Sequence, residues 1–185
     1  MNSTAPLPDD PVFREPWEAH AFALTVSLHE RGLFTWPEWA DALGAQIAAA
    51  QARGRAAHAY LALVDFARSE TDDDLLARAT TDADTRVELR AWFARFHAGP
   101  LCARLRGARS VEREIPLTYR DPAGRVVHGV IDVLWQDSDG AWHVVDWKTD
   151  RAPDASRHAA QLAAYAQGVQ RALGLARSPD AEAFF

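Results

Sequence analysis

The sequence predicts an α+β fold, in which a small mixed β-sheet is flanked by helices and preceded by an N-terminal helical segment. Two observations support this prediction. Residues 129–135 and 142–149 are apolar and rich in β-branched side chains, and the polar, turn-forming residues 136–141 between them are typical of a β-hairpin. Outside this hairpin the sequence is rich in alanine, which mainly favours helices.

Two helices are expected near the N-terminus. The first begins at Pro16 and runs to Gly32, because glycine is a common residue at the C-terminal end of a helix. Thr35 and Glu38 then have the spacing of a capping box, with Thr35 as the N-cap of the second helix. The second helix carries apolar residues at helical spacing and is expected to end near Gly54.

The middle of the chain is expected to be helical as well. Residues 57–68 are interpreted as a helix, and the acidic residues 69–74 as a loop that caps the next one. Residues 74–98 form an amphipathic helical pattern, which Gly99 and Pro100 interrupt. A short helix through Arg106 then leads to the first strand.

The register of the predicted hairpin places two acidic residues face to face. If the loop is residues 138–140, residues whose numbers sum to 278 lie opposite each other, so Asp132 is expected directly opposite Asp146. Cβ atoms in such a pair are about 4.5–5.5 Å apart on one face. Lys148 shares that face because strand side chains alternate with period two. Two facing carboxylates repel each other, and a divalent cation between them is the simplest remedy.

The surroundings of these acids favour a functional site. The alternative interpretation of an Asp-x-Lys sequence is a solvated strand edge with a weak ion pair. Here the neighbours on both strands are valine, isoleucine, leucine and tryptophan, which predicts strands that are largely buried. Because burying two acids and a lysine costs free energy unless they are paired or bind a metal, we interpret them as a functional site.

These residues resemble the PD-(D/E)xK nuclease superfamily, in the branch formed by the C-terminal nuclease domains of RecB- and AddA-type helicase-nucleases. The resemblance runs from about residue 54 to residue 185 and rests on five motifs in the family's order. They are a Gly-x-x-x-His helix at 54–58, a strand at 111–117, Gly-Val-Ile-Asp at 129–132, Asp-Trp-Lys-Thr-Asp at 146–150 and a Gln-Leu-x-x-Tyr helix at 161–166.

The resemblance implies a restriction-endonuclease-like fold and a site for Mg²⁺ or Mn²⁺. His58, Asp132 and Asp146 would ligate the ion, and the backbone carbonyl of Trp147 would complete the protein ligands; the family usually has tyrosine at this position. Asp132, Asp146 and Lys148 would be the catalytic residues. Lys148 would position or help deprotonate the attacking water and offset charge in the transition state.

The implied reaction is metal-dependent hydrolysis of DNA phosphodiesters by an exonuclease that acts on single strands or ends, in DNA end processing or recombinational repair, with a helicase as an implied partner. Gln161 and Tyr165 are four residues apart on a predicted helix and share a face. That face either contacts the site or the nucleic-acid backbone, or packs as an ordinary helix. Arg151 is a further candidate for substrate binding. The arginines at 104, 106, 109 and 113 are expected near the site, as phosphate contacts or as a solvated face.

Residues 11–50 resemble a different family, the nitrile hydratase accessory proteins and the N-terminal region of the nitrile hydratase β subunit. This second resemblance implies an alternative function, a non-catalytic protein that binds the nitrile hydratase α subunit during metal loading. Trp17, Phe34, Trp36 and Trp39 would form the contact surface, or alternatively a small helical core. The chain is therefore expected to comprise a helical segment, residues 1–53, and a nuclease-like domain, residues 54–185, that ends at the start of its last strand.

Composition narrows these expectations. The net charge of -6 argues against a protein that coats DNA by bulk electrostatics, although a local basic patch suffices for a nuclease. The single cysteine, Cys102, excludes an intramolecular disulfide and an iron-sulfur cluster, which needs about four thiolates. The sequence has no signal-peptide pattern and no apolar run of the roughly 18 residues that a membrane span needs. A cytoplasmic protein without membrane association is expected.

Overall fold

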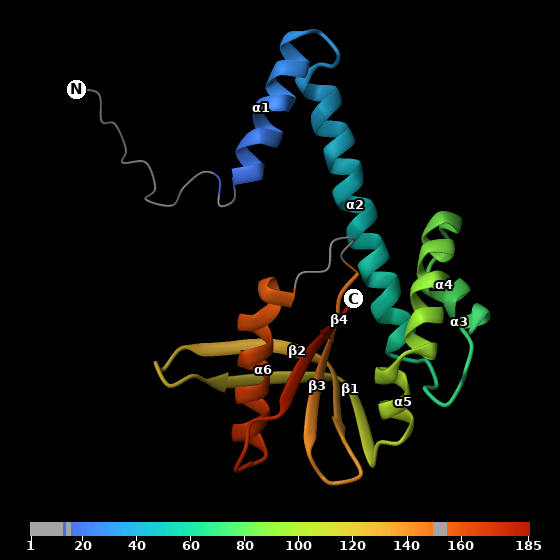
Figure 1. Cartoon of the computed structure of the whole chain (residues 1–185), viewed down its shortest axis with the longest axis vertical. Coiled ribbons are helices and arrows are strands. Elements are labelled where there is room, and N and C mark those ends of the chain that lie inside the picture. The colour runs from blue at the N-terminus through green and yellow to red at the C-terminus, as the bar shows by residue number, and fades with distance from the viewer. Residues whose placement is uncertain (1–12, 14–15, 150–154) are drawn as a thin grey trace. The chain divides into compact units, whose positions relative to one another are not determined.

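The computed structural model describes residue 13, residues 16–149 and residues 155–185 of the chain (Figure 1). The chain divides into two compact units, residues 1–49 and residues 50–185. In chain order the described elements are α1 (Pro16–Glu30), α2 (Trp36–Leu61), α3 (Asp73–Ala79), α4 (Ala83–Ala98), α5 (Pro100–Arg106), β1 (Ser110–Arg120), β2 (Val126–Gln136), β3 (Trp142–Trp147), the 3-10 helix η1 (Ala155–His158), α6 (Ala159–Ala172) and β4 (Asp180–Phe184).

The turn between α1 and α2 confirms both end signals. Gly32 adopts φ 75°, in the left-handed region that glycine enters without a steric penalty, and α1 ends two residues before it. At the start of α2, the backbone N–H of Thr35 donates to Glu38 Oε2 (2.7 Å), and that of Glu38 donates to Thr35 Oγ1 (3.4 Å). These two reciprocal bonds form the predicted capping box.

The expectation that the second helix ends near Gly54 was wrong, because α2 continues through Gly54 to Leu61. A glycine inside a helix costs only about 1 kcal/mol relative to alanine. This cost is offset because the next turns bury side chains in the core, among them Ala57, Tyr60 and Leu61, each 0% exposed. The helix expected over residues 57–68 is therefore the last turn of α2 followed by irregular chain.

The amphipathic segment 74–98 is also divided differently from the prediction. It forms two helices, α3 and α4, because the side chain of Asp82 accepts a hydrogen bond from the backbone N–H of Thr85 and so caps a new helix. Asp72, in the acidic loop, caps α3 in the same way, as predicted. Gly99 interrupts the chain in an extended conformation, and Pro100 occupies the first turn of α5, where proline is well tolerated.

The sheet confirms the predicted α+β class. Its strand order is β1-β2-β3-β4; the first two pairings are antiparallel, and β4 lies parallel to β3. In the β2–β3 hairpin, Val133 lies opposite Val145 and Gln136 opposite Trp142, so the predicted register, in which paired numbers sum to 278, is confirmed. The strand expected at the C-terminal end of the chain is β4.

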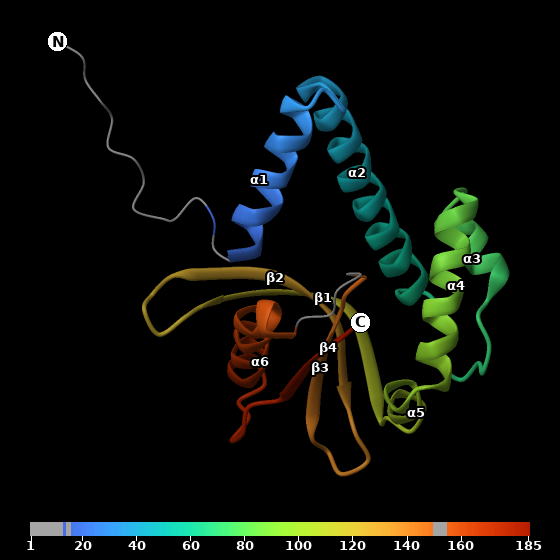
Figure 2. The same ribbon diagram turned by 45° about the horizontal axis from the view of Figure 1, so that its top comes forward.

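Both faces of the sheet are covered within the second unit. On one face, a core of residues from α2–α5 packs against Val133, Trp135, Val145 and Trp147. On the other, Tyr165 and Val169 of α6 pack against apolar residues of β1, β2 and β3. Helix α6 accordingly lies on the side of the sheet away from α4 and α5 (Figure 1 and Figure 2). Because both faces are buried, a charged group on the central strands needs a partner. No described helix is long and apolar enough to cross a membrane.

Candidate metal centre

Asp132 and Asp146 are the two buried carboxylates of the sheet. Asp132 lies on β2 and Asp146 on β3, one step beyond the last ladder pair, Val133–Val145, and they are 5% and 3% exposed. The backbone N–H of Trp147 donates to Asp132 Oδ2 at 2.6 Å. This bond fixes one oxygen of Asp132 and leaves the other for a further partner.

Lys148 follows directly after β3 and is drawn into the same site. Its Nζ lies 2.6 Å from Asp146 Oδ2, and its side chain is 19% exposed. Burial raises the pKa of Asp146, the Lys148 ammonium opposes this, and Asp132 raises the pKa further. Oδ2 of Asp146 is buried, and the Lys148 ammonium is its charged partner.

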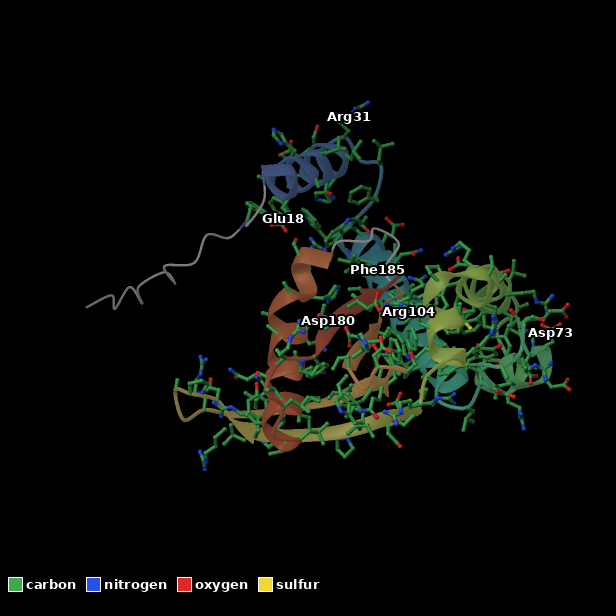
Figure 3. The ribbon with its side chains drawn as sticks, turned by 60° about the horizontal axis from the view of Figure 1, so that its bottom comes forward. Glu18, Arg31, Asp73, Arg104, Asp180 and Phe185 are labelled. Atoms are coloured by element: carbon green, nitrogen blue, oxygen red, sulfur yellow. The ribbon has the colours of Figure 1, made fainter. Side chains whose placement is uncertain are left out.

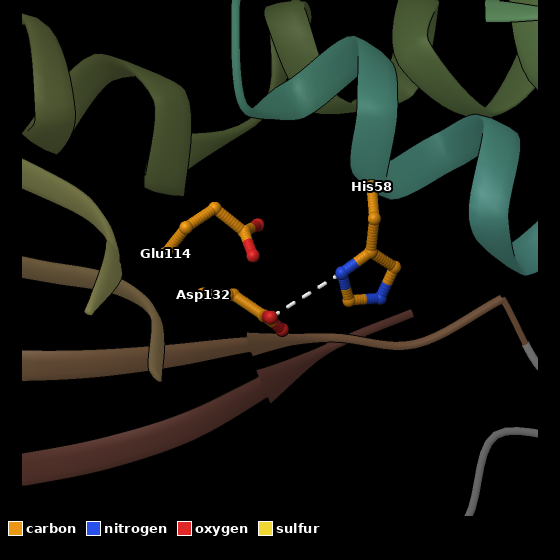
Figure 4. Close-up of side chains that lie close together, drawn as sticks. All are labelled: His58, Glu114 and Asp132. Atoms are coloured by element: carbon orange, nitrogen blue, oxygen red, sulfur yellow. Dashed lines mark ion pairs between the residues drawn. The ribbon is translucent and has the colours of Figure 1, made fainter. Parts of the chain in front are cut away.

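His58 reaches Asp132 from the helical layer. It lies on α2, and its Nδ1 is 3.3 Å from Asp132 Oδ1 (Figure 4). The hydrogen bond to Asp132 raises the pKa of His58, while burial opposes the shift and the charges of Asp132, Glu114 and Asp146 add to it. The His58 side chain is 39% exposed, so this side of the site is open to solvent.

Glu114 is a member of the site that the sequence interpretation missed. Its carboxylate, Nδ1 or Nε2 of His58 and a carboxylate oxygen of Asp132 all lie within 4.8 Å of one another (Figure 4). Burial raises the pKa of Glu114, and the charge of Asp132 raises it further. A signal was available, because the register of the β1–β2 hairpin places position 114 opposite position 132, just as that of β2–β3 places 146 there.

The donor set fits a divalent cation such as Mg²⁺ or Mn²⁺. Carboxylate oxygens are the ligands that these ions prefer, and imidazole is accepted by Mn²⁺ and its first-row neighbours. Possible ligand atoms of His58, Glu114 and Asp132 all lie within 4.8 Å of one another, a spacing at which a single ion could contact them. The structure thus brings His58 next to Asp132, with Glu114 beside them, and Asp146 lies across the hairpin from Asp132. That His58, Asp132 and Asp146 ligate one ion stays a prediction.

Helix α6 contacts the site through a chain of hydrogen bonds. Nζ of Lys148 donates to Gln161 Oε1 (3.2 Å), and Gln161 Nε2 donates to the hydroxyl of Tyr165 (2.9 Å). Both interpretations of this helix face are seen, because Gln161 contacts Lys148 while Tyr165 packs in the core beneath α6. The position of Tyr165 also explains why residue 129 is a glycine, because a Cβ atom there would lie 2.6 Å from Cε1 of Tyr165.

Comparison with known families agrees with this geometry. The family profile described as the PD-(D/E)XK nuclease superfamily matches residues 28–185, which is most of the chain. The chain belongs to this superfamily. Among curated proteins, it is similar to an ATP-dependent helicase/nuclease subunit from Heliobacterium modesticaldum, with 33% identity over 55% of this chain and 9% of the relative.

Two further helicase/nuclease subunits of the same type are similar. The protein of Desulforudis audaxviator is 34% identical over 66% of this chain and 12% of its own length, and that of Carboxydothermus hydrogenoformans is 32% identical over 63% of this chain and 12% of its own length. The chain therefore spans about a tenth of the length of these relatives.

The resemblance of residues 11–50 to nitrile hydratase accessory proteins is not supported. The superfamily match begins at residue 28, inside that segment, and the relatives named above are helicase/nuclease subunits. Among the aromatic residues proposed for a contact surface, the rings of Trp36 and Trp39 pack edge to face at 5.8 Å, and Trp36 also contacts His29. These contacts are those of a small helical packing unit.

The remaining candidates of the sequence interpretation fall into three groups. Arg151 lies outside the described residues. The side chain of Trp147 is buried in the core, and the role of its carbonyl stays a prediction. Three of the four arginines expected near the site bind other partners: Arg106 donates to three backbone carbonyls, Arg113 donates to the carbonyl of Ala62, and Arg104 (labelled in Figure 3) pairs with Glu182. These arginines hold the helices and β4 in place.

Proposed function

We propose that this protein hydrolyses DNA phosphodiester bonds in a reaction that depends on a divalent metal ion. The observation that carries the proposal is the buried pair Asp132 and Asp146 with Lys148 2.6 Å from the second acid. A sheet buried on both faces does not hold two facing carboxylates without compensation. Membership of a nuclease superfamily supports this chemistry.

The residues of the site divide into ligands and a base or stabiliser. His58, Asp132 and Asp146, with the carbonyl of Trp147, would hold Mg²⁺ or Mn²⁺. When bound, the ion would lower the pKa of a water molecule and polarise the scissile phosphate. Lys148 is held between Asp146 and Gln161, so its ammonium is oriented to position the attacking water and to offset negative charge in the transition state.

The composition of the chain supports a specific role for Lys148. It is the only lysine of the chain, whereas nineteen residues are arginine. An ammonium is a compact charge with a pKa that its environment shifts readily, while a guanidinium is planar and always protonated. A site that requires proton transfer or a compact cation therefore accepts lysine and not arginine, even in a chain that otherwise uses arginine throughout.

The substrate and partner follow from the relatives. Their description as ATP-dependent helicase/nuclease subunits supports DNA as the substrate and a helicase as the partner. We propose that the nuclease-like domain, residues 54–185, acts on single strands or on ends that such a helicase exposes, with Gln161, Tyr165 and Arg151 near the substrate. The function is one of end processing or recombinational repair in the cytoplasm.

The test is cleavage of labelled single-stranded and duplex DNA in EDTA, Mg²⁺ or Mn²⁺. Cleavage is expected only with metal, and Lys148→Ala and Asp146→Ala are each expected to lower the rate at least about 100-fold. Lys148→Arg keeps the positive charge but is expected to lower the cleavage rate as well. Asp139→Ala, at the exposed hairpin turn, is the matched control. Cleavage that survives both alanine variants, or that is absent with every metal, contradicts the proposal.

A further inference from the structure

Glu114 has an unusual backbone for a residue inside a strand. Its φ is 51°, in the left-handed region, and among the described residues other than glycine it is the only one with a positive φ. A glutamate there is strained, because its Cβ crowds the backbone. Strain of this kind persists where the surrounding structure enforces it, and it is concentrated at functional sites.

The left-handed residue reverses the faces of β1. Val111 packs against the core beneath α2–α5, and the Arg113 guanidinium lies 4.0 Å from the ring of Phe66 in that core. Strict alternation would keep Ile115 on the same face. Instead, Ile115 packs with the core beneath α6. Glu114 thus stands at the point where the strand changes face, and this change lets one strand serve both cores.

The reversal occurs directly across from Asp132. The β1–β2 ladder pairs Arg113 with Val133 and Ile115 with Ile131, so position 114 faces position 132. In Figure 4 the Glu114 side chain extends toward the gap between Asp132 and His58. The β1–β2 ladder contains no pair between Glu114 and Asp132, so these two residues are not held in regular sheet geometry. Their carboxylate oxygens lie within 4.8 Å of each other.

The carboxylate of Glu114 lacks a cationic partner within the described chain. It forms no ion pair within 4.0 Å, although Asp132 and His58 offer ligand atoms within 4.8 Å. Two carboxylates this close repel unless a cation lies between them. Unlike Asp132, Glu114 is exposed, so it borders the site on its solvent side.

We propose that Glu114 is a direct ligand of the same divalent ion, on its solvent side, in addition to His58, Asp132 and Asp146. This inference rests on the proposed metal-dependent function. The three carboxylates together carry the charge that balances a divalent ion and the Lys148 ammonium. The left-handed backbone of Glu114 turns its carboxylate toward the ion, and the backbone strain is the free-energy cost of that orientation.

The test measures binding of Mn²⁺ alone to the full chain, by electron paramagnetic resonance and calorimetry. Glu114→Gln keeps the shape of the side chain and removes its charge, and we expect at least about tenfold weaker binding. Glu112→Gln removes the same charge from the same strand two residues away and should bind like the wild type. Asp132→Asn, at a ligand of the proposed function, should weaken binding at least as much as Glu114→Gln.

A stability measurement separates a ligand from a structural residue. Glu114→Gly relieves the backbone strain, so its thermal midpoint should equal or exceed that of the wild type while its Mn²⁺ affinity falls. If Glu114→Gln binds Mn²⁺ like the wild type while Asp132→Asn does not, the inference is overturned and the proposed function stands. If the wild type binds no Mn²⁺ at all, both are overturned. A lower midpoint for Glu114→Gly, with unchanged affinity, assigns Glu114 a structural role and also overturns the inference.

Discussion

Replacing Gly129 by alanine tests how closely α6 can approach the sheet. A Cβ atom on Gly129 would lie 2.6 Å from Cε1 and 3.0 Å from the hydroxyl oxygen of Tyr165. Carbon atoms in contact prefer about 3.5–4.0 Å, so the ring has to move by about 1 Å. Tyr165 is 7% exposed and accepts a hydrogen bond from Gln161, so the ring is held on both sides.

The size of the effect follows from this crowding. Overpacking a well-packed core by one methyl group costs about 1–3 kcal/mol. For a chain of this length, about 2–4 °C of midpoint is lost per kcal/mol, so we expect Gly129→Ala to lower the thermal midpoint by about 2–12 °C. Gly44→Ala is the control of opposite sign, because a Cβ atom on Gly44 meets nothing within 4 Å and alanine is the better helix former.

A double-mutant cycle decides whether Tyr165 is the cause. In a Tyr165→Leu background the obstructing ring atoms are gone, so Gly129→Ala should become neutral or slightly stabilising, since alanine lowers the entropy of the unfolded chain. Urea denaturation of the four proteins gives the coupling free energy. If Gly129→Ala costs the same in both backgrounds, or nothing in either, the close approach of α6 does not explain the glycine.

Three further predictions concern other parts of the second unit. Gln161→Ala should lower the cleavage rate about tenfold, because the amide orients Lys148, whereas Gln170→Ala on the same helix should not change it. His97 is buried, and burial lowers its pKa from 6.5. The unfolded chain therefore binds more protons than the folded chain as the pH falls below 6.5. The folded protein accordingly loses stability as the pH falls from 6.5 toward the folded pKa of His97. The difference in urea midpoint between the wild type and His97→Gln should therefore change between pH 7.5 and pH 5, and a constant difference contradicts this. Phe184→Ala should cost about 2–3 kcal/mol in urea denaturation, because the ring packs against three aromatic side chains; a loss below 1 kcal/mol refutes that packing role.

Local patterns in the sequence predicted the elements that depend on few residues. The capping box at Thr35 and the end of α1 before Gly32 require only neighbouring residues, and both are found. The register of the β2–β3 hairpin follows from its turn length and alternation. The end of α2 could not be predicted this way. Gly54 is a weak helix breaker, and burial of later side chains outweighed it.

The residues of the site also divide into those that local sequence patterns predict and those that they do not. Asp132, Asp146 and Lys148 could be placed together from the sequence, because a short hairpin with period-two alternation brings them to one point. His58 was recognised only through a family resemblance, since it comes from a helix more than seventy residues earlier. Glu114 was missed because the register of the β1–β2 hairpin, which places position 114 opposite position 132, was not worked out from the sequence. Its left-handed backbone is seen only in the structure.

The sequence alone thus determined the fold class, the central hairpin and the acid pair that it holds, because these depend on turns and alternation within about twenty residues. The tertiary structure decided which groups surround that pair. It brought His58 from α2 and Glu114 from β1 to Asp132, and Gln161 from α6 to Lys148. The physical reason is that packing on both faces of the sheet, and the change of face at Glu114, are set by contacts between segments far apart in the chain.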